Sequence, residues 1–182
     1  RSIQPDQDAN ILLAVHAVGL NFRDVLNVLD MYPGDPGPPG GDFSGVVTRM
    51  SSDIANGVPI GVGDAVFGLA AGCLGSHTVT SIDATAPVPV HLSHAEASTL
   101  PTVYVTVELA LRWSVGIRSS ESVLVHATTG GVGMAASSVI GALGGSVIGT
   151  AGSSVKRHQI RRMGVRCALG SRDTCYASQV SP

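Results

Sequence analysis

The stretch SVLVHATTGGVGMAASSVIGALGGSVIGTA, residues 122–151, decides the fold of this chain. Residues 122–125 form a short apolar run rich in β-branched side chains, which predicts a buried strand. Residues 132–143 have helical character and end at a pair of glycines, where helices commonly stop. Residues 146–150 predict a second buried strand. The stretch therefore predicts a βαβ unit, in which a helix connects two parallel strands.

The turn between the first strand and the helix carries a G-x-G-x-x-A pattern at residues 131–136. Glycine allows a sharp turn and lets the backbone approach a pyrophosphate, which then binds the unpaired N–H groups of the helix N-terminus. The pattern alone is weak evidence, but its place between a predicted strand and a predicted helix strengthens it. It indicates a dinucleotide-binding, or Rossmann, unit. The alternative is a glycine-rich packing turn that binds no ligand.

The residues after the second strand favour NADPH over NADH. In this fingerprint an acidic residue about 20 positions further on binds the ribose hydroxyls of NAD. Residues 151–157, AGSSVKR, contain no acid but two serines and two cations. A carboxylate would repel the 2′-phosphate of NADPH, whereas hydroxyls and cations can hold it. The alternative for Lys156 and Arg157 is an ordinary solvated helix start.

The composition argues against several other classes of protein. The chain has 182 residues, 44% hydrophobic and 13% charged, with a formal net charge of −2, so it can bury a core and has no basic surface typical of nucleic-acid binding. Residues 122–155 carry no formal charge, but glycine pairs divide this run into pieces shorter than the ~20 apolar residues of a membrane span. Three scattered cysteines form no disulfide or metal pattern. We therefore expect a cytoplasmic protein without membrane or nucleic-acid partners.

The N-terminal half predicts a β-rich domain. Short strands are expected at 11–19, 45–50, 65–69 and 77–82, and such spacing is typical of a small β barrel or sandwich. Between the first two strands lie a helix at 20–29, with Asn21 as its N-cap, and a rigid proline–glycine loop at 31–41. An extended segment is expected at 87–92.

The remaining predicted elements complete the order of the chain. Ser93 and Glu96 match a capping box that starts a helix to about residue 100, and a longer apolar helix follows at 102–114. After the βαβ unit we expect a helix at 155–163 and a third strand at 165–169. A dinucleotide-binding sheet has about six strands, so three predict an apparently truncated domain. Without an initiator Met, residue 1 is expected to be a cut within a longer protein.

With these residues in view, the chain resembles the zinc-independent medium-chain dehydrogenase/reductases, and more narrowly the enoyl reductase domains of modular polyketide synthases. The resemblance covers nearly the whole chain in order. It rests on GLNFRDVL at 19–26, MYPG at 31–34, LPTVYVT at 100–106, SVLVHA at 122–127, GGVGMAA at 130–136 and SRD at 171–173. It implies a GroES-like β barrel for substrate and catalysis at 1–100, followed by an incomplete Rossmann domain, a doubly wound parallel sheet that binds NADPH, at 101–182.

The resemblance implies NADPH-dependent reduction of the α,β double bond of an enoyl thioester. The thioester would be carried on an acyl carrier protein during polyketide or fatty acid synthesis. Implied partners are this carrier and the neighbouring domains of a multienzyme, and a homodimer is compatible with the resemblance. Two alternatives stay open: a free-standing quinone oxidoreductase-like NADPH reductase, and a non-catalytic truncated fragment.

The resemblance also implies roles for single residues. Tyr32 would protonate the α-carbon, and a phenol is chemically able to do so; the alternative is a tyrosine that only packs beside Pro33. The expected cofactor-binding residues are Asn21 and Thr106 near the nicotinamide, Thr129, Gly130, Gly131, Val132 and Gly133 at the pyrophosphate, and Lys156 with Ser153 and Arg172 at the 2′-phosphate.

The chain departs from the wider superfamily in two places. Residues 40–42 read Gly-Gly-Asp where the zinc branch has Gly-His-Glu, and catalytic zinc needs about three protein ligands, so we expect no metal. The lysine and aspartate that the family offers as proton donors lie in the second half of the cofactor domain, which this chain lacks. Whether the chain alone binds NADPH or turns over therefore stays open.

Overall fold

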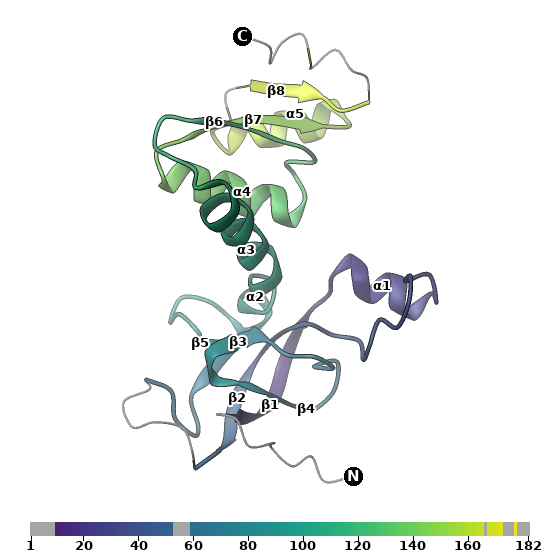
Figure 1. The fold of residues 1–182 in the computed structure, drawn as a ribbon, viewed down its shortest axis with the longest axis vertical. Coiled ribbons are helices and arrows are strands. Elements are labelled where there is room, and N and C mark those ends of the chain that lie inside the picture. Colours follow the sequence, from purple (N-terminus) through teal and green to yellow (C-terminus); the bar gives the residue numbers. More distant parts are fainter. Residues whose placement is uncertain (1–9, 53–58, 166, 173–176, 178–182) are drawn as a thin grey trace. The chain divides into compact units, whose positions relative to one another are not determined.

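A computed structural model describes residues 10–52, 59–165, 167–172 and 177. The chain divides into two compact units, Arg1–Thr102 and Val103–Pro182, here called the N-terminal and C-terminal units. Figure 1 labels their helices and strands. Asp173, part of the last block of the resemblance, lies outside the described residues.

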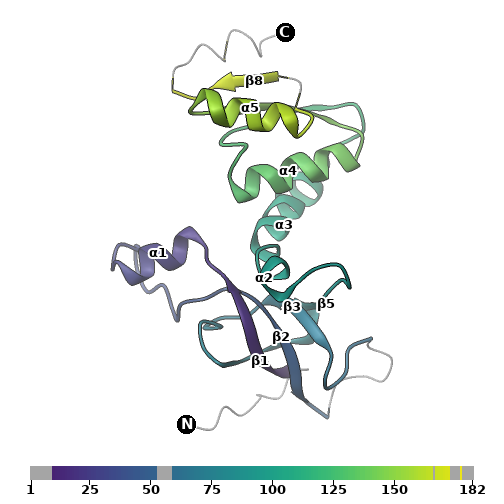
Figure 2. The same cartoon turned by 180° about the vertical axis from the view of Figure 1, so that it is seen from behind.

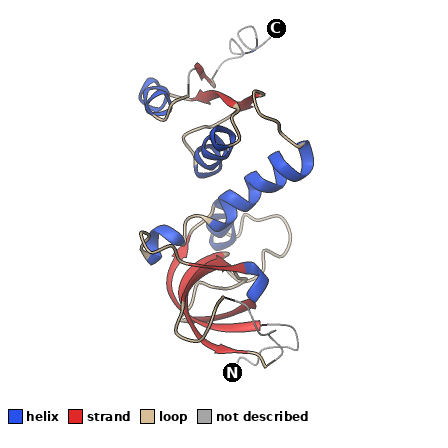
Figure 3. Cartoon of the chain, turned by 90° about the vertical axis from the view of Figure 1, so that its left-hand side faces the viewer, coloured by secondary structure: helices blue, strands red, loops and turns tan. Residues whose placement is uncertain are grey.

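The N-terminal unit is built on a five-stranded antiparallel sheet with the order β4-β1-β2-β3-β5. Figure 3 shows these strands in red, curled into a barrel-like layer. Strand β2 begins three residues before the predicted strand, because Asp42 pairs with Gly19 and Leu69. The segment predicted to be extended at 87–92 belongs to a strand only at Pro87. The strands are β1 (Asn10–Gly19), β2 (Asp42–Met50), β3 (Ala65–Leu69), β4 (His77–Ser81) and β5 (Thr85–Pro87).

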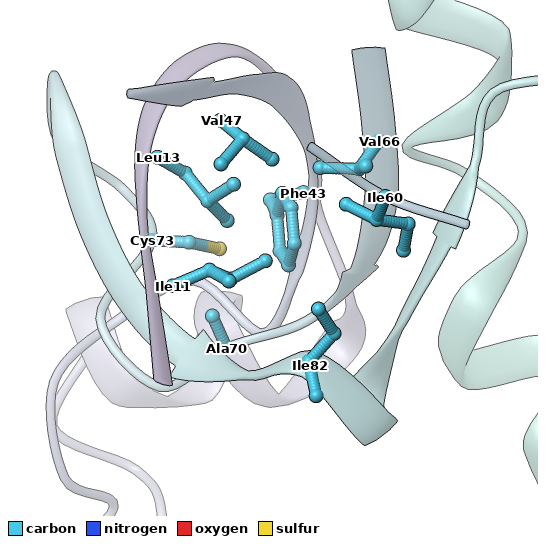
Figure 4. Close-up of a cluster of buried hydrophobic side chains, with 9 residues drawn as sticks. All are labelled: Ile11, Leu13, Phe43, Val47, Ile60, Val66, Ala70, Cys73 and Ile82. Atoms are coloured by element: carbon cyan, nitrogen blue, oxygen red, sulfur yellow. The ribbon is translucent and has the colours of Figure 1, made fainter. Parts of the chain in front are cut away.

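The core of the N-terminal unit lies inside the curled sheet. Alternate residues point to one face of a strand, so Ile11 and Leu13 of β1 both face this core, as Phe43 and Val47 of β2 do. Figure 4 shows the side chains meeting around the fully buried ring of Phe43. The cluster comprises Ile11, Leu13, Phe43, Val47, Ile60, Val66, Ala70, Cys73 and Ile82.

Short helices lie between and after these strands. Helix α1 (Phe22–Val28) has Asn21 as its N-cap, as predicted. Helix α2 (His94–Ala97) starts with the predicted capping box: Ser93 Oγ accepts from the Glu96 N–H at 3.3 Å, and Glu96 accepts from the Ser93 N–H at 2.9 Å. The Ser93 hydroxyl, which donates to the Glu96 carboxylate at 2.7 Å, and next the Ser93 N–H lower the pKa of Glu96. A single 3₁₀ turn, Ile82–Ala84, joins β4 to β5.

A histidine of α2 joins this helix to the sheet. His94 Nδ1 lies 2.7 Å from Ser44 Oγ, and that hydroxyl donates to the Val66 carbonyl at 3.1 Å. The Ser44 oxygen therefore accepts from an Nδ1–H group. The ring of His94 also contacts the ring of His16, with centroids 4.7 Å apart and the two planes tilted by 48°. Burial, and next the neighbouring His16, lower the pKa of His94.

We expect the N-terminal unit to lose stability as the pH falls below about 6.5, the ordinary pKa of histidine. Below it, the unfolded chain takes up a proton that folded His94 resists, so protonation favours unfolding. His94→Asn keeps an N–H donor near Ser44 but cannot titrate. The stability of this variant should therefore depend less on pH in this range. Denaturant unfolding between neutral and mildly acid pH measures this change in stability, and His158→Asn, a substitution of an exposed histidine, is the control. An unchanged slope in His94→Asn would contradict the assignment.

The C-terminal unit has a parallel sheet with the order β6-β7-β8. The strands are β6 (Ser122–Val125), β7 (Ser146–Ala151) and β8 (Cys167–Gly170), close to the predicted limits. Helix α4 (Gly131–Ala142) packs on β6 and β7, and α5 (Ser154–Arg162) packs on β7 and β8 (Figure 2). The apolar face of α4 forms the core with Ala135, Ala136, Val139 and Ile140. The predicted βαβ unit is therefore present.

The long apolar helix predicted at 102–114 is not one regular α-helix. Helix α3 covers Pro101–Val107, and the next eight residues, Glu108–Val115 (η2), are π-helical. The Ser114 hydroxyl donates to the carbonyl of Leu109, five residues back, which matches the wider turn. The segment ends at Gly116 with φ +66°, a left-handed conformation that glycine adopts without strain. Among the described residues, no helix is both long and apolar enough to cross a bilayer.

Candidate active site

The glycine turn after β6 presents the start of α4. Gly130 is the N-cap of α4 and offers no side chain to cap it. Its own N–H donates to the Ala127 carbonyl at 2.8 Å, which closes the turn. The first N–H groups of a helix have no partners within the helix. This end of α4 can therefore donate hydrogen bonds to an anionic group such as a pyrophosphate.

Gly133 allows α4 to approach the turn closely. A Cβ atom at this position would lie 2.6 Å from Thr128 Cα and 2.7 Å from the Ala127 carbonyl oxygen, so only glycine fits. Thr128 is fully buried, and its hydroxyl lies 2.8 Å from the Val125 carbonyl and 3.3 Å from the Thr150 carbonyl. The turn is thus held between the ends of β6 and β7.

The predicted 2′-phosphate residues follow the carboxyl ends of neighbouring strands. Ala151 at the end of β7 pairs with Gly170 at the end of β8, so Ser153 and Arg172 come from the same edge of the sheet. Ser153 is the N-cap of α5, and its oxygen accepts from the Lys156 N–H at 3.3 Å. The hydroxyl hydrogen can still be donated to a ligand.

Two arginines lie at this edge. A Cβ atom on Gly152 would lie 3.5 Å from Arg172 Nε, which places that side chain beside the turn. Arg157 Nη1 donates to the Ala151 carbonyl at 3.3 Å, so its guanidinium lies at the end of β7. Residues 151–172 contain no Asp or Glu. The described residues of this edge therefore carry cations and no acid, which suits a 2′-phosphate, and Asp173 follows Arg172 outside the described residues.

In the N-terminal unit, two buried carboxylates hold Asn21. Asp24 accepts the Asn21 backbone N–H with Oδ2 and the Gly40 N–H with Oδ1, each at 2.8 Å. Asp42 accepts the Asn21 side-chain amide with Oδ2 at 3.0 Å. Asp24 is 8% exposed and Asp42 is 2% exposed. The backbone and the side chain of Asn21 are therefore fixed by different acids.

The second oxygen of Asp42 reaches the start of α3. Asp42 Oδ1 accepts the Thr102 N–H at 3.0 Å and the Thr102 hydroxyl at 2.6 Å. Its backbone carbonyl accepts from the Cys73 thiol at 3.3 Å. Burial, and next the charge of Asp42, raise the pKa of Cys73 to about 11, so this thiol stays protonated at neutral pH. Asp42 and Thr102 were not predicted as site residues.

Tyr32 lies on the proline–glycine loop after α1. The Arg23 guanidinium carbon lies 5.5 Å from the centre of the Tyr32 ring, and Arg23 also donates to the Pro36 carbonyl. Asn27 donates to the Gly37 carbonyl at 2.9 Å. Two side chains of α1 therefore hold the loop, and the half-buried Tyr32 lies under one of them.

A pocket of about 560 Å³ opens beside this loop in the N-terminal unit. Its volume is within the range of small-molecule sites. Arg23 lines the pocket and contacts the Tyr32 ring, whereas Tyr32 itself is not one of the lining residues. Other lining residues include Pro36, Gly40, Leu69, Thr80 and Thr102.

The predicted site residues fall in both units. Asn21 and Tyr32 belong to the N-terminal unit, at the start of α1 and on the loop that follows it. The C-terminal unit holds Thr106 on α3, Thr129, Gly130, Gly131, Val132 and Gly133 at the glycine turn, and Ser153, Lys156 and Arg172 at the edge of the sheet. The part of the chain that the structure describes contains no group of three or more His, Cys, Asp or Glu arranged for a metal ion.

Comparison with known sequences finds polyketide synthase proteins as relatives. The chain is 42% identical over 132 residues to the spectinabilin polyketide synthase system protein NorB of Streptomyces orinoci, which is 72% of this chain and 6% of NorB. It is 37% identical over 177 residues to a phenolphthiocerol/phthiocerol polyketide synthase protein of Mycobacterium tuberculosis, covering 96% of this chain and 8% of that protein. The chain thus spans less than a tenth of these multienzymes. No family model matches it.

Solved structures are similar over almost the whole chain. The CurK enoyl reductase matches with a TM-score of 0.86 and 29% identity, over 99% of this chain and 57% of CurK. The quinone oxidoreductase of Coxiella burnetii matches with a TM-score of 0.82 and 27% identity, over 99% of this chain and 59% of that protein.

The curled antiparallel sheet, the parallel sheet with its glycine turn and these likenesses give the chain the fold of the medium-chain dehydrogenase/reductases. The predicted fold class, a GroES-like barrel followed by a Rossmann sheet, is confirmed. By sequence the chain is a homologue of modular polyketide synthase proteins, and by structure it is similar to the enoyl reductase CurK.

Proposed function

We propose that this chain is part of an NADPH-dependent enoyl reductase domain of a polyketide synthase. The domain reduces the α,β double bond of an enoyl thioester carried on an acyl carrier protein. The observation that carries the proposal is the likeness to the CurK enoyl reductase over 99% of this chain, together with polyketide synthases as sequence relatives. Neighbouring domains of the multienzyme are then its partners, the cytoplasm is its compartment, and a homodimer is an expected assembly.

The residues present fit NADPH. The uncapped start of α4, reached by the glycine turn, supplies backbone N–H groups for a pyrophosphate. Ser153, Lys156 and Arg172 supply a hydroxyl and two cations at an edge whose described residues include no acid, which suits a 2′-phosphate better than the free hydroxyls of NADH. Asn21 and Thr106 are proposed to contact the nicotinamide end.

When bound, NADPH would supply a hydride for the β-carbon of the enoyl thioester. The α-carbon must then receive a proton, and we assign its delivery to the Tyr32 hydroxyl. Arg23 would hold the Tyr32 ring near the pocket, since it contacts both the ring and the Pro36 carbonyl. The apolar part of the pocket would exclude water from the acyl chain.

The experiment that tests the proposal uses the full-length protein with NADPH and a crotonyl thioester. Saturable loss of NADPH fluorescence, with the butyryl thioester as product, is the expected result. Oxidation of NADPH by quinones without reduction of the thioester would instead favour the quinone oxidoreductase-like alternative. No oxidation with either acceptor would favour a non-catalytic role.

Tyr32→Phe is expected to lower kcat by about 100-fold, because a positioned general acid contributes roughly 10²–10⁴-fold. The Kd for NADPH should not change, since the phenol acts on the substrate. Steady-state kinetics and fluorescence titration measure the two quantities. Tyr104→Phe, at a half-exposed position of α3, is the control and should leave both unchanged. An unchanged kcat in Tyr32→Phe would remove Tyr32 from the mechanism.

A further inference from the structure

The carboxylate of Asp42 is buried and is satisfied by neutral donors alone. With 2% exposure it has lost nearly all contact with water, which is unfavourable for a charged group unless hydrogen bonds replace that contact. Three donors do so: the Asn21 amide at 3.0 Å, the Thr102 N–H at 3.0 Å and the Thr102 hydroxyl at 2.6 Å. Both oxygens act as acceptors, as an ionised carboxylate requires.

Asp42 stands at a rigid point of the N-terminal unit. It is the first residue of β2, and it pairs with Gly19 on one side and Leu69 on the other. Its neighbour Phe43 is fully buried in the core. The carboxylate is thus mounted on a central strand, and a side chain bound to it is held by the sheet rather than by a loop.

The groups that Asp42 holds belong to the proposed reductase site. Asn21 is the residue proposed to contact the nicotinamide, and Thr102 lines the 560 Å³ pocket. Asp24 accepts the backbone N–H groups of Asn21 and Gly40. Among the described residues, Asp42 is the acid that accepts the side-chain amide of Asn21. Loss of the carboxylate would leave the Asn21 backbone in place and release its side chain.

We infer that Asp42 is a positioning residue of the reductase site, which acts by orienting the Asn21 carboxamide and fixing the first turn of α3 at Thr102. The inference rests on the proposed function. Small displacements of a positioning group can slow a reaction by about 100-fold without removing any reacting group. A purely structural role for Asp42 would instead lower stability and leave the rate of the folded enzyme unchanged.

A double-mutant cycle in the full-length protein tests this inference. The variants are Asp42→Asn, Asn21→Ala and the double variant, with hydride transfer measured in single turnover and NADPH Kd measured by fluorescence. We expect each single variant to slow hydride transfer by about tenfold or more. The double variant should be no slower than the slower single variant, because residues that act through one another are not additive. Effects that multiply in the double variant would overturn the inference.

Ser44→Ala is the matched control. Ser44 is also fully buried on β2, and its hydroxyl bonds to Val66 and His94 rather than to Asn21. This variant should lose stability in denaturant unfolding but keep the rate per folded molecule. Should Asp42→Asn fail to fold, Asp42→Glu keeps the carboxylate and should be slowed less than Asn21→Ala. A rate loss in Ser44→Ala equal to that of Asp42→Asn, or an Asp42→Glu variant as slow as Asn21→Ala, would overturn the positioning role.

Failure of the proposed function gives a different result from failure of this inference. If the wild-type protein binds NADPH but does not reduce the thioester, the proposed function is wrong. Coupling between Asp42 and Asn21 in the NADPH Kd then decides the inference: a non-additive cycle supports it and an additive one overturns it. If the wild-type protein binds no NADPH, both the proposed function and the inference about Asp42 are wrong.

Discussion

Gly133→Val is expected to abolish NADPH binding by the protein at concentrations where the wild type is saturated. The first side-chain carbon would lie 2.6 Å from Thr128 Cα and 2.7 Å from the Ala127 carbonyl oxygen, and both atoms belong to the backbone of the turn. A flexible side chain could move away, but a closed turn cannot. Either α4 or the turn must shift, and the N–H groups that would hold the pyrophosphate shift with it.

The stability of the C-terminal unit should fall as well. Overpacking a close contact costs about 1–3 kcal/mol, and valine adds two further methyl groups to the contact made by the Cβ atom. Fluorescence titration with NADPH and denaturant unfolding measure both effects. Binding that survives with an unchanged Kd would mean that the start of α4 is not the pyrophosphate site.

Gly141→Ala is the control for Gly133→Val. Gly141 lies in the same helix, and its Cβ would have no atom within 4 Å. Alanine in an exposed helix is better than glycine by roughly 0.5–1 kcal/mol. This variant should therefore be slightly more stable than the wild type and bind NADPH unchanged, which separates the contact at Gly133 from helix propensity.

Ser153→Asp is expected to reverse the cofactor preference. Aspartate caps a helix as well as serine does, so the start of α5 should persist with the Lys156 N–H still bonded. The new carboxylate would repel a 2′-phosphate and could accept the ribose hydroxyls of NADH. Like charges near a protein surface repel by a few kcal/mol, and about 1.4 kcal/mol corresponds to a tenfold change in Kd.

We therefore expect the NADPH Kd to rise by about 100-fold and the NADH Kd to fall. Parallel titrations with the two nucleotides measure the ratio. Ser153→Asn is a neutral residue that also caps helices well, so it isolates the charge and should change the ratio far less. An unaltered ratio in Ser153→Asp would place the 2′-phosphate away from the start of α5.

The sequence predicts best where neighbouring residues determine the structure. The limits of β6, α4 and β7 follow from an apolar run, a glycine turn and a glycine stop within thirty residues of chain, and the structure has them within about one residue. The capping box of α2 depends on Ser93 and Glu96 alone. These patterns are local, so the structure they predict does not depend on contacts with distant residues.

The contacts of Asp42 could not be predicted in the same way. Its partners lie 21 and 60 residues away in the sequence, so only the folded chain brings them together. One signal was present: an acid opens the apolar run DFSGVV at residues 42–47, and a charge beside a buried strand needs partners. The π-helical segment after Val107 gave no local signal, since its composition suits an α-helix equally well.

The hydroxyl of Thr128 has a consequence for the thermodynamics of ligand binding. It joins the turn to the last carbonyl of β6 and to a carbonyl of β7, so contacts within the protein itself hold the turn in place. A loop held in this way loses little conformational freedom when a nucleotide arrives, so little of the binding free energy is spent on ordering it. The affinity for a nucleotide at this turn therefore depends mainly on the contacts formed. The entropy of nucleotide binding should come more from the release of water than from a loss of backbone freedom.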